Sequence, residues 1–461
     1  MTRTIHLTID GRPVQVAPGT TVLQAAKAAG IHIPTLCYLE KINAIGACRV
    51  CLIQVEGMRG YHTSCTLPSA EGMVVHTKTP ALRDARRTVV ELLLSDHNVE
   101  CPTCLRSGNC ELEDLAHETG VRRIPYGGER HAWRRDHSTP SLNWDLSKCV
   151  LCQRCVATCS QVQTVSAIGL IDRGFDSHIG VPYDHDLLQA TCTYCGQCAL
   201  ACPTGAITEK DDTDAVWAAL ADPSKHVVVQ TAPAVRVALA ETYGLAPGAV
   251  TPGQMVAALR ELGFDRVFDT NFAADLTIME EASELVERIK DNGPLPLITS
   301  CSPGWVKFME HFYPDFMENV SSCKSPQQMF GAVAKTYYAK KAGIDPKDMV
   351  VVSLMPCTAK KFEAARPEMS ASGYRDVDHV ITTRELGRML HQAGIDLPGL
   401  AEEPFDNPLG QSTGAGMIFG VTGGVMEAAL RTAADWLGGR DLPRLVFSEV
   451  RGLEGVREAE V

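Results

Sequence analysis

The sequence contains two matching cysteine runs, Cys149-Val-Leu-Cys152-Gln-Arg-Cys155-Val-Ala-Thr-Cys159 and Cys192-Thr-Tyr-Cys195-Gly-Gln-Cys198-Ala-Leu-Ala-Cys202-Pro203. Each run has the spacing C-x2-C-x2-C-x3-C, which is typical of a bacterial ferredoxin with two 4Fe-4S clusters. Three closely spaced thiolates bind one cube, and the fourth binds the other cube. A zinc ion, the alternative for CxxC pairs, needs only four ligands, and eight cysteines are too many for it. We therefore assign one cube to Cys149, Cys152, Cys155 and Cys202, and the second to Cys192, Cys195, Cys198 and Cys159.

The first 80 residues have a different cysteine pattern. Alternating runs from Thr4 to Ile9 and from Val14 to Val16 flank Asp10-Gly11, which predicts a β-hairpin, and a helix is expected from Thr21 to Ala29. This order is typical of plant-type 2Fe-2S ferredoxins, although ten residues rather than four separate the first two cysteines. A four-thiolate zinc site is the alternative. The expected ligands of the 2Fe-2S cluster are Cys37, Cys48, Cys51 and Cys65.

A third group of ligands follows an expected helix from Ala81 to Leu94. It contains only three cysteines, Cys101, Cys104 and Cys110, whereas a cube needs four ligands. His97, four residues before the first of them, supplies the missing ligand, and its neutral imidazole is expected to raise the potential of the cluster. A three-cysteine zinc site is the alternative.

Every cysteine up to Cys202 is assigned to a cluster. Up to Cys202 the sequence contains fifteen cysteines, and with His97 these make sixteen ligands. Sixteen ligands are enough for one 2Fe-2S cluster and three 4Fe-4S clusters. The sequence therefore predicts a chain of electron carriers.

Composition limits the class of protein. A length of 461 residues predicts several domains, and the net charge of -12 argues against a nucleic-acid partner. We see no signal peptide and no run of eighteen apolar residues, and we interpret Asn407 to Met426 as a packed glycine-rich turn region. Thiolates that bind iron must stay reduced, which favours the cytoplasm and anaerobic conditions.

From Asp211 onward cysteines become rare and α/β patterning begins. Strands are expected at Val227–Val229, Arg266–Phe268, Leu295–Thr299 and Val350–Leu354, with helices at Thr251–Leu262 and Leu276–Lys290. This alternation predicts a parallel sheet with ligands at the carboxyl ends of its strands. The expected fold is thus α+β and α/β, in four domains. These are a plant-type 2Fe-2S domain (1–80), a 4Fe-4S module with one histidine and three cysteine ligands (81–137), a two-4Fe-4S ferredoxin domain (138–212) and an α/β catalytic domain (213–461).

Two motifs in the last domain lead to a family. The motifs Thr299-Ser-Cys301-Ser302-Pro-Gly-Trp305 and Met355-Pro-Cys357-Thr-Ala-Lys360 resemble the first two signature motifs of FeFe hydrogenases. Further stretches of this resemblance are Thr231–Arg236, Phe272–Glu281, Val320–Gln328 and Ile418–Glu427. The first two N-terminal modules are similar to those of FeFe hydrogenases and of the large iron–sulfur subunit of respiratory complex I.

The resemblance implies reversible interconversion of H2 with protons and electrons at an H-cluster, a 4Fe-4S cube joined to a two-iron subsite. By position, Cys357 matches a cube ligand, Lys360 a cyanide-binding lysine, and Pro233, Gln327 and Met355 neighbours of the two-iron subsite. A proton relay is implied for Cys301, Glu281, Glu284, Ser321 and Arg288. The helical spacing of Glu281, Glu284 and Arg288 places them on one face, where the alternative is a solvated charged face.

Two departures from the family's pattern concern the cube of the H-cluster. The family usually has two adjacent cysteines in the first motif, whereas this sequence has Cys301-Ser302, so that either residue is a candidate ligand. The third motif, with two further cysteines, is expected beyond Val461, which indicates a truncated protein or a partner from a split gene. Cys323 is interpreted as a packing or surface residue.

The leading hypothesis is therefore a cytoplasmic FeFe hydrogenase catalytic subunit in a hetero-oligomer. Its expected electron partners are ferredoxin or flavin-containing NAD(P)H-oxidising subunits, with no membrane and no nucleic acid. The alternatives are a non-catalytic electron-transfer subunit of the complex I or formate dehydrogenase type and, less favoured, a hydrogen sensor.

Overall fold

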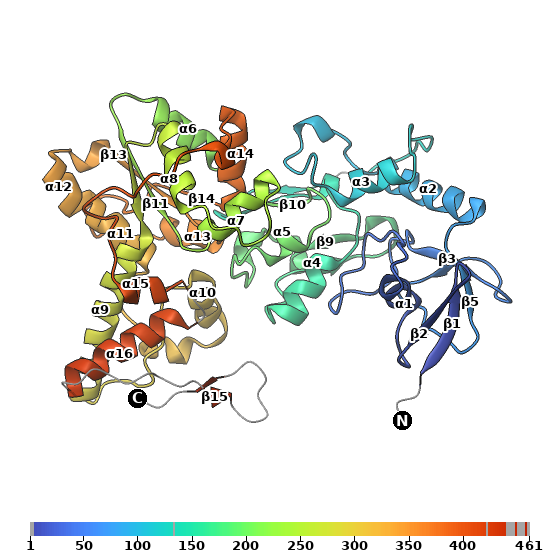
Figure 1. Ribbon diagram of the computed structural model, residues 1–461, viewed down its shortest axis with the longest axis horizontal. Helices are drawn as coiled ribbons and strands as arrows, with labels where there is room; N and C mark the ends of the chain where they lie inside the picture. The colour runs from blue at the N-terminus through green and yellow to red at the C-terminus, as the bar shows by residue number, and fades with distance from the viewer. Residues whose placement is uncertain (1–3, 132–133, 421–422, 439–447, 450–456, 459–461) are drawn as a thin grey trace. The chain divides into compact units, whose positions relative to one another are not determined.

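The computed structural model describes residues 4–131, 134–420, 423–438, 448–449 and 457–458 (Figure 1). The chain forms two compact units. The first comprises residues 1–192 and 196–210, and the second comprises residues 193–195 and 211–461. The break at 210/211 coincides with the change in composition at Asp211. Among the described residues, no helix has the length and apolar character needed to span a bilayer.

The first unit begins with a five-stranded sheet in the order β2-β1-β5-β3-β4. The predicted hairpin is confirmed, because β1 (Ile5–Ile9) pairs antiparallel with β2 (Arg12–Val16) across a turn in which Asp10 and Gly11 have φ of 49° and 77°. The predicted helix is also confirmed as α1 (Val22–Ala28), which Thr21 and Gln24 begin with a capping box. The remaining strands are β3 (Leu52–Val55), β4 (His62–Thr63) and β5 (Val74–His76).

The rest of the first unit consists of short elements between the cysteine loops. The predicted helix at 81–94 is α2 (Pro80–Ser95), capped by Thr79. A small sheet has the order β10-β7-β6 and a two-stranded ribbon joins β8 to β9. These elements are α3 (Glu111–Glu118), β6 (Arg135–Asp136), β7 (Leu142–Asp145), α4 (Arg154–Ala157), η3 (Thr158–Val162), β8 (Gly169–Ile171), β9 (His178–Gly180), α5 (Gln197–Ala201) and β10 (Ile207–Glu209).

The second unit is built on a four-stranded parallel sheet, as predicted. Its order is β12-β11-β13-β14, with β11 (His226–Thr231) and β13 (Met349–Leu354) in the centre. The outer strands are β12 (Arg266–Asp269) and β14 (His379–Ile381). Both central strands are almost entirely buried, because helices and loops cover both faces of a parallel sheet.

Helices alternate with these strands (Figure 1). The longest, α9 (Thr270–Lys290), starts directly after β12 and packs against α11 and α16. The other helices are α6 (Thr213–Ala221), α7 (Val235–Ala238), α8 (Pro252–Glu261), α10 (Pro303–Phe312), α11 (Pro326–Val333), α12 (Ala339–Ala342), α13 (Ala359–Ala365), α14 (Thr383–Ala393), α15 (Gly414–Ile418) and α16 (Gly424–Gly438).

Two sequence predictions in this unit were wrong. Residues Leu295–Thr299 do not form a strand, and only a single bridge joins Ile298 to Val320. Pro296 has no N–H to donate to a sheet ladder, so the apolar run alone was a weak signal. The glycine-rich stretch from Asn407 to Met426 is not only turn, because it contains α15 and the start of α16. Residues 421–422 of the Ile418–Glu427 stretch and the end of the chain at Val461 lie outside the described residues.

Candidate active site and cluster ligands

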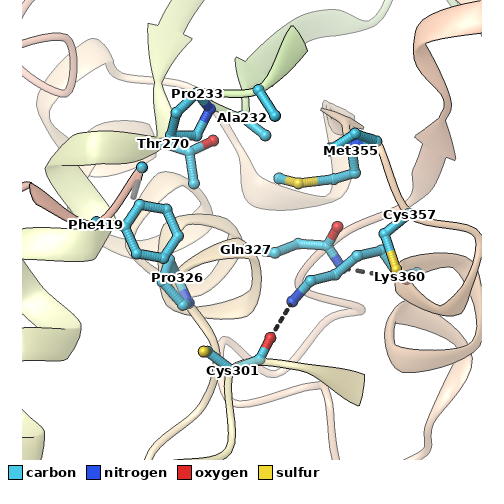
Figure 2. Close-up of a pocket in the computed structure, with 13 residues that line it drawn as sticks. Ala232, Pro233, Thr270, Cys301, Pro326, Gln327, Met355, Cys357, Lys360 and Phe419 are labelled. Carbon is cyan, nitrogen blue, oxygen red and sulfur yellow. Dashed lines mark hydrogen bonds between the residues drawn. The ribbon is translucent and has the colours of Figure 1, made fainter. Parts of the chain in front are cut away.

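A cavity of about 250 Å³ lies at the carboxyl end of β11 and β13. Figure 2 shows side chains from several separate segments of the chain facing it. The wall is mostly apolar, but it includes two thiols, one lysine and one amide. Its lining residues are Ala232, Pro233, Ala234, Thr270, Cys301, Pro326, Gln327, Met355, Pro356, Cys357, Lys360, Phe419 and Gly420. The structure thus brings together six residues that the resemblance singled out, namely Pro233, Cys301, Gln327, Met355, Cys357 and Lys360.

Lys360 lies between the two thiols of this cavity. Its Nζ donates a hydrogen bond to the Cys301 carbonyl oxygen at 2.9 Å (Figure 2). It also donates to Glu363 Oε2 at 2.9 Å. Glu363 is buried and also accepts hydrogen bonds from Ser325 Oγ at 2.9 Å and Gln327 Nε2 at 3.0 Å. The i,i+3 spacing of Lys360 and Glu363 in the sequence could have identified this carboxylate, which sequence reasoning missed.

The cavity fits a polar, metal-containing group. Gln327 Oε1 is buried and makes no hydrogen bond to any described group. Such an atom in an otherwise apolar wall is costly unless a ligand satisfies it. A Cβ added at Gly420 would lie 3.2 Å from Pro233 Cβ, so the glycine leaves room at the cavity edge. Two sulfurs, an ammonium group and an unpaired amide oxygen fit an iron cofactor with polar ligands.

The first motif presents Cys301 and Ser302 differently. Cys301 lines the cavity, whereas Ser302 is exposed at the N-cap of α10 and does not line it. Burial raises the pKa of the Cys301 thiol, and the Lys360 charge partly opposes this rise. The cysteine is therefore the member of the pair that faces the cavity.

A buried carboxylate on α9 lies behind Cys301. Glu281 is 1% exposed, and among the described residues only the Ser300 backbone N–H acts on its carboxylate as a donor, without a well-formed hydrogen bond. Burial raises its pKa to about 7. Such a group exchanges protons readily near neutral pH.

One turn further along α9, Glu284 is fully paired. Its carboxylate accepts hydrogen bonds from Ser321 Oγ at 2.6 Å and from Arg288 Nη2 at 2.6 Å. Burial alone would raise the pKa of Glu284, but the hydrogen bonds from Ser321, Ser322 and Arg288 hold it below its usual range. The alternative of a solvated charged face is therefore contradicted, since Glu281 is buried and Glu284 is enclosed by its partners.

Arg288 and Ser321 also line a second cavity of about 630 Å³. Ser300, which directly precedes Cys301, lines this cavity too. Cys323 was interpreted as a packing or surface residue, but its Sγ lies 3.6 Å from Glu284 Oε2, and its N–H donates to Ser321 Oγ at 3.1 Å. Cys323 therefore contacts the predicted relay, and no spacing signal in the sequence indicated this.

The first unit contains all the other predicted ligands except Cys195, which is assigned to the second unit. Cys37, Cys48, Cys51 and Cys65 are all buried, and Cys51 Sγ lies 3.4 Å from Cys65 Sγ. His97 is 7% exposed, and burial lowers its pKa to about 4, so the imidazole is neutral and able to bind a metal. Its Nδ1 is buried without a described hydrogen-bond partner. Buried thiols and a neutral imidazole are the types of ligand that iron–sulfur clusters use.

One of the two ligand sets assigned to the ferredoxin runs lines a single pocket, whereas the other is located only by the elements that carry it. One pocket is lined by Cys149, Cys152, Cys155 and Cys202, the four residues assigned to one cube. Of the other set, Cys159 lies on η3 and Cys198 on α5, and these two helices pack against each other. Cys192 and Cys195 lie in the loop that precedes α5. Cys101, Cys104 and Cys110 lie between α2 and α3, and Gly205 packs against the Cys104 sulfur.

Comparisons with known protein families divide the chain into N-terminal iron–sulfur domains and a C-terminal hydrogenase domain. The family model described as "Iron only hydrogenase large subunit, C-terminal domain" matches residues 225–461. A 2Fe-2S iron–sulfur cluster binding domain matches residues 2–80, and an NADH-ubiquinone oxidoreductase-G iron–sulfur binding region matches residues 86–125. The ferredoxin-like domain of NADH-quinone oxidoreductase subunit 3 matches residues 139–208. The zinc alternatives are thereby overturned, because the matched N-terminal domains bind iron–sulfur clusters.

Two curated relatives match almost the whole chain, and a solved structure matches about half of it. The NADP-reducing hydrogenase subunit HndD of Solidesulfovibrio fructosivorans is 52% identical over 99% of this chain and 80% of that protein. Iron hydrogenase 1 of Clostridium pasteurianum is 42% identical over 98% of this chain and 79% of that protein. A solved structure of apo [FeFe]-hydrogenase HydA1 from Chlamydomonas reinhardtii covers 54% of this chain and 64% of that chain at 56% identity, with a TM-score of 0.49. Because its second unit matches the family model and two relatives match nearly its whole length, the chain belongs to the iron-only hydrogenases, as a catalytic subunit with 2Fe-2S and 4Fe-4S domains.

Proposed function

We propose that the chain interconverts H2 with protons and electrons at the 250 Å³ cavity and passes the electrons along four iron–sulfur clusters. The observation that supports this most is that the cavity thiol Cys301, the buried Glu281 and the paired Glu284 lie close enough to act on one another electrostatically. Ser321 and Arg288, the partners of Glu284, line the second cavity.

When bound, an H-cluster would supply the iron site at which the H–H bond forms or breaks. Cys357 and Cys301 would hold it through sulfur, and Lys360, Gln327 and Pro233 would surround its diatomic ligands. Met355 would pack against it. The Lys360 ammonium is suited to this role because Glu363 fixes its position at 2.9 Å. The mostly apolar remainder of the wall would exclude water and strengthen these electrostatic contacts.

Protons would move along the chain's own acids. The Cys301 thiol would exchange a proton with Glu281, whose pKa of about 7 suits both directions of transfer. Glu281 would exchange it with the group formed by Glu284 and Ser321, where Arg288 stabilises the carboxylate. The second cavity, which Ser321 and Arg288 line, would connect this group to water.

Electrons would travel through four proposed ligand sets. The 2Fe-2S cluster would bind in domain 1–80 and the His97-containing cube in domain 81–137. Two further cubes would bind in domain 138–212. The pocket lined by Cys149, Cys152, Cys155 and Cys202 supports one of these cube assignments.

The expected partners are NAD(P)-linked subunits in a hetero-oligomer, with a flavin or a ferredoxin as the immediate electron carrier. The name of the HndD relative mentions NADP reduction, and other relatives are NADH-quinone oxidoreductase and NADPH-Fe(3+) oxidoreductase subunits. A reducing cytoplasm is the proposed compartment, since unassembled cluster thiolates must stay reduced.

The test combines composition with spectroscopy. Anaerobically purified chain should contain about fourteen irons from one 2Fe and three 4Fe clusters before any H-cluster is added. After incubation with the two-iron cofactor, carbonyl and cyanide infrared bands and H2 evolution should appear together. Infrared bands without H2 turnover would refute the proposed catalysis, and a much lower iron content would refute the ligand sets.

A further inference from the structure

Three of the proposed cluster loops meet at one buried arginine. Arg154 lies between Cys152 and Cys155, is 5% exposed, and begins α4. Its Nη2 donates to the Tyr38 carbonyl oxygen at 2.9 Å, directly after Cys37 in the chain. The guanidinium also donates to both carboxylate oxygens of Glu111 at 2.6 and 2.8 Å, directly after Cys110. One side chain thus contacts the loops of the 2Fe-2S cluster, the His97 cube and the Cys149 cube.

A second side chain reinforces this junction. Asn43, 4% exposed, donates through Nδ2 to the Cys37 carbonyl oxygen at 2.8 Å and to the Cys152 carbonyl oxygen at 2.9 Å. The same amide group therefore links a proposed ligand of the 2Fe-2S cluster to a proposed ligand of the cube. Cys37, Cys48 and Cys152 also share one apolar core, against which Cys110 packs.

The two charged side chains of this junction, Arg154 and Glu111, differ in their exposure to solvent. The Arg154 side chain is 7% exposed, whereas the Glu111 side chain is 45% exposed. Water and salt screen the exposed carboxylate more strongly than the buried guanidinium. The net field at the neighbouring cysteines is therefore positive. A positive field favours the reduced form of a cluster, because reduction adds an electron.

We propose that Arg154 is a positioning residue that joins the three cluster loops, and that its buried charge holds electrons on the cube of Cys149, Cys152, Cys155 and Cys202. Asn43 maintains the short hydrogen-bonded connection between this cube and the 2Fe-2S cluster. The inference rests on the proposed ligand sets, which the iron and sulfide content of the unsubstituted protein tests separately.

The experiment is an EPR-monitored redox titration of the anaerobic full chain with its ferredoxin-type clusters and without the two-iron cofactor. R154Q removes the buried cation, and E111Q removes its exposed partner. The two variants should shift the reduction potential of the Cys149 cube in opposite directions. R154Q should lower this potential, and E111Q should raise it by a smaller amount. For charges about 10 Å apart at an effective dielectric constant of about 20, R154Q should change the equilibrium constant for reduction of the cube on the order of tenfold. A tenfold change is about 59 mV for a one-electron couple. Spin coupling to the reduced 2Fe-2S cluster identifies the affected cube.

Matched variants separate charge from general damage. Arg173→Gln removes an exposed arginine from the same unit and should leave the potentials unchanged. Arg154→Lys keeps the charge but cannot reproduce the forked contacts, so it should keep the potential and alter the spin coupling. Asn43→Ala should weaken the spin coupling with little change in potential. The proposal is overturned if R154Q and R173Q behave alike, or if R154Q and E111Q shift the potential in the same direction. If R154Q loses iron, an unchanged potential in E111Q overturns it as well.

Discussion

The substitution Glu281→Gln should lower activity and raise stability at the same time. Glu281 is fully buried, and its pKa rises from 4.5 to about 7 because burial disfavours the charged carboxylate. One pKa unit corresponds to 1.36 kcal/mol, so ionised Glu281 costs the fold about 3 kcal/mol. Glutamine has nearly the same shape but cannot ionise, and it therefore avoids this cost.

The sign of the pH dependence follows from the raised pKa. Below pH 4.5 Glu281 is protonated in both the folded and the unfolded protein, so it does not lower the free energy of unfolding. As the pH rises from 4.5 to about 7, the unfolded chain ionises while the folded chain resists, and stability falls. Above about pH 7 the loss is complete. The stabilisation by Glu281→Gln should therefore be about 1 kcal/mol at pH 5.5 and about 3 kcal/mol at pH 8.5.

Activity should change in the opposite direction. An amide cannot pass a proton from Cys301 to Glu284, and a positioned acid–base group contributes about a hundredfold to ten-thousandfold. H2 evolution from a reduced viologen dye should fall by this factor, at unchanged iron content. The apparent melting temperature of the catalytic unit should rise by about 6–12 °C at pH 8.5.

The matched control is Glu280→Gln on the same helix. Glu280 is exposed, so its substitution should change neither turnover nor the pH dependence of stability. The reasoning is refuted if Glu281→Gln keeps turnover within a few fold of the unsubstituted protein. It is also refuted if Glu281→Gln and Glu280→Gln shift the melting temperature equally at both pH values.

Three further substitutions test other parts of the structure. Ser321→Ala removes a 2.6 Å hydrogen bond to Glu284 and should raise the pKa of that carboxyl, moving the pH–activity profile to higher pH. Lys361→Met leaves the buried Glu385 without its 2.9 Å partner, and the loss of stability should be about 3–5 kcal/mol in denaturant titrations. His97→Cys replaces a neutral ligand with an anionic one, so redox titration should give a lower potential for one cluster while the iron content is unchanged.

Local spacing carried most of the correct predictions. Cys149, Cys152 and Cys155 line one pocket, because three cysteines within seven residues share one loop. The strands β11 and β13 were also predictable, since uninterrupted valine runs suit a sheet that is buried on both faces. The run at 295–299 was apolar too, but Pro296 prevents a regular ladder, and the structure contains only one bridge there.

Contacts between distant segments were not predictable from spacing. Gln230, on the central strand β11, donates to the Gln327 carbonyl oxygen at 2.9 Å and accepts from Thr270 Oγ1 at 3.1 Å. It thereby supports two residues of the cavity wall, yet nothing near it in the sequence indicates this role. Arg154 and Asn43 are similar cases, because one partner of each lies more than a hundred residues away.

The two consecutive lysines of α13 explain how a flexible side chain is held in place at the cavity. Successive helical residues point about 100° apart, so Lys360 faces the cavity while Lys361 faces the other side. There Lys361 pairs with Glu385 at 2.9 Å and Asp212 at 2.8 Å, which anchors α13 to α14 and to the start of α6. Buried ion pairs add little net stability, but they are sensitive to geometry. The anchored helix therefore fixes where Lys360 can reach, and Glu363 restricts it further. We infer that this double restraint orients the cavity lysine before any cofactor binds, which is the arrangement that electrostatic stabilisation requires.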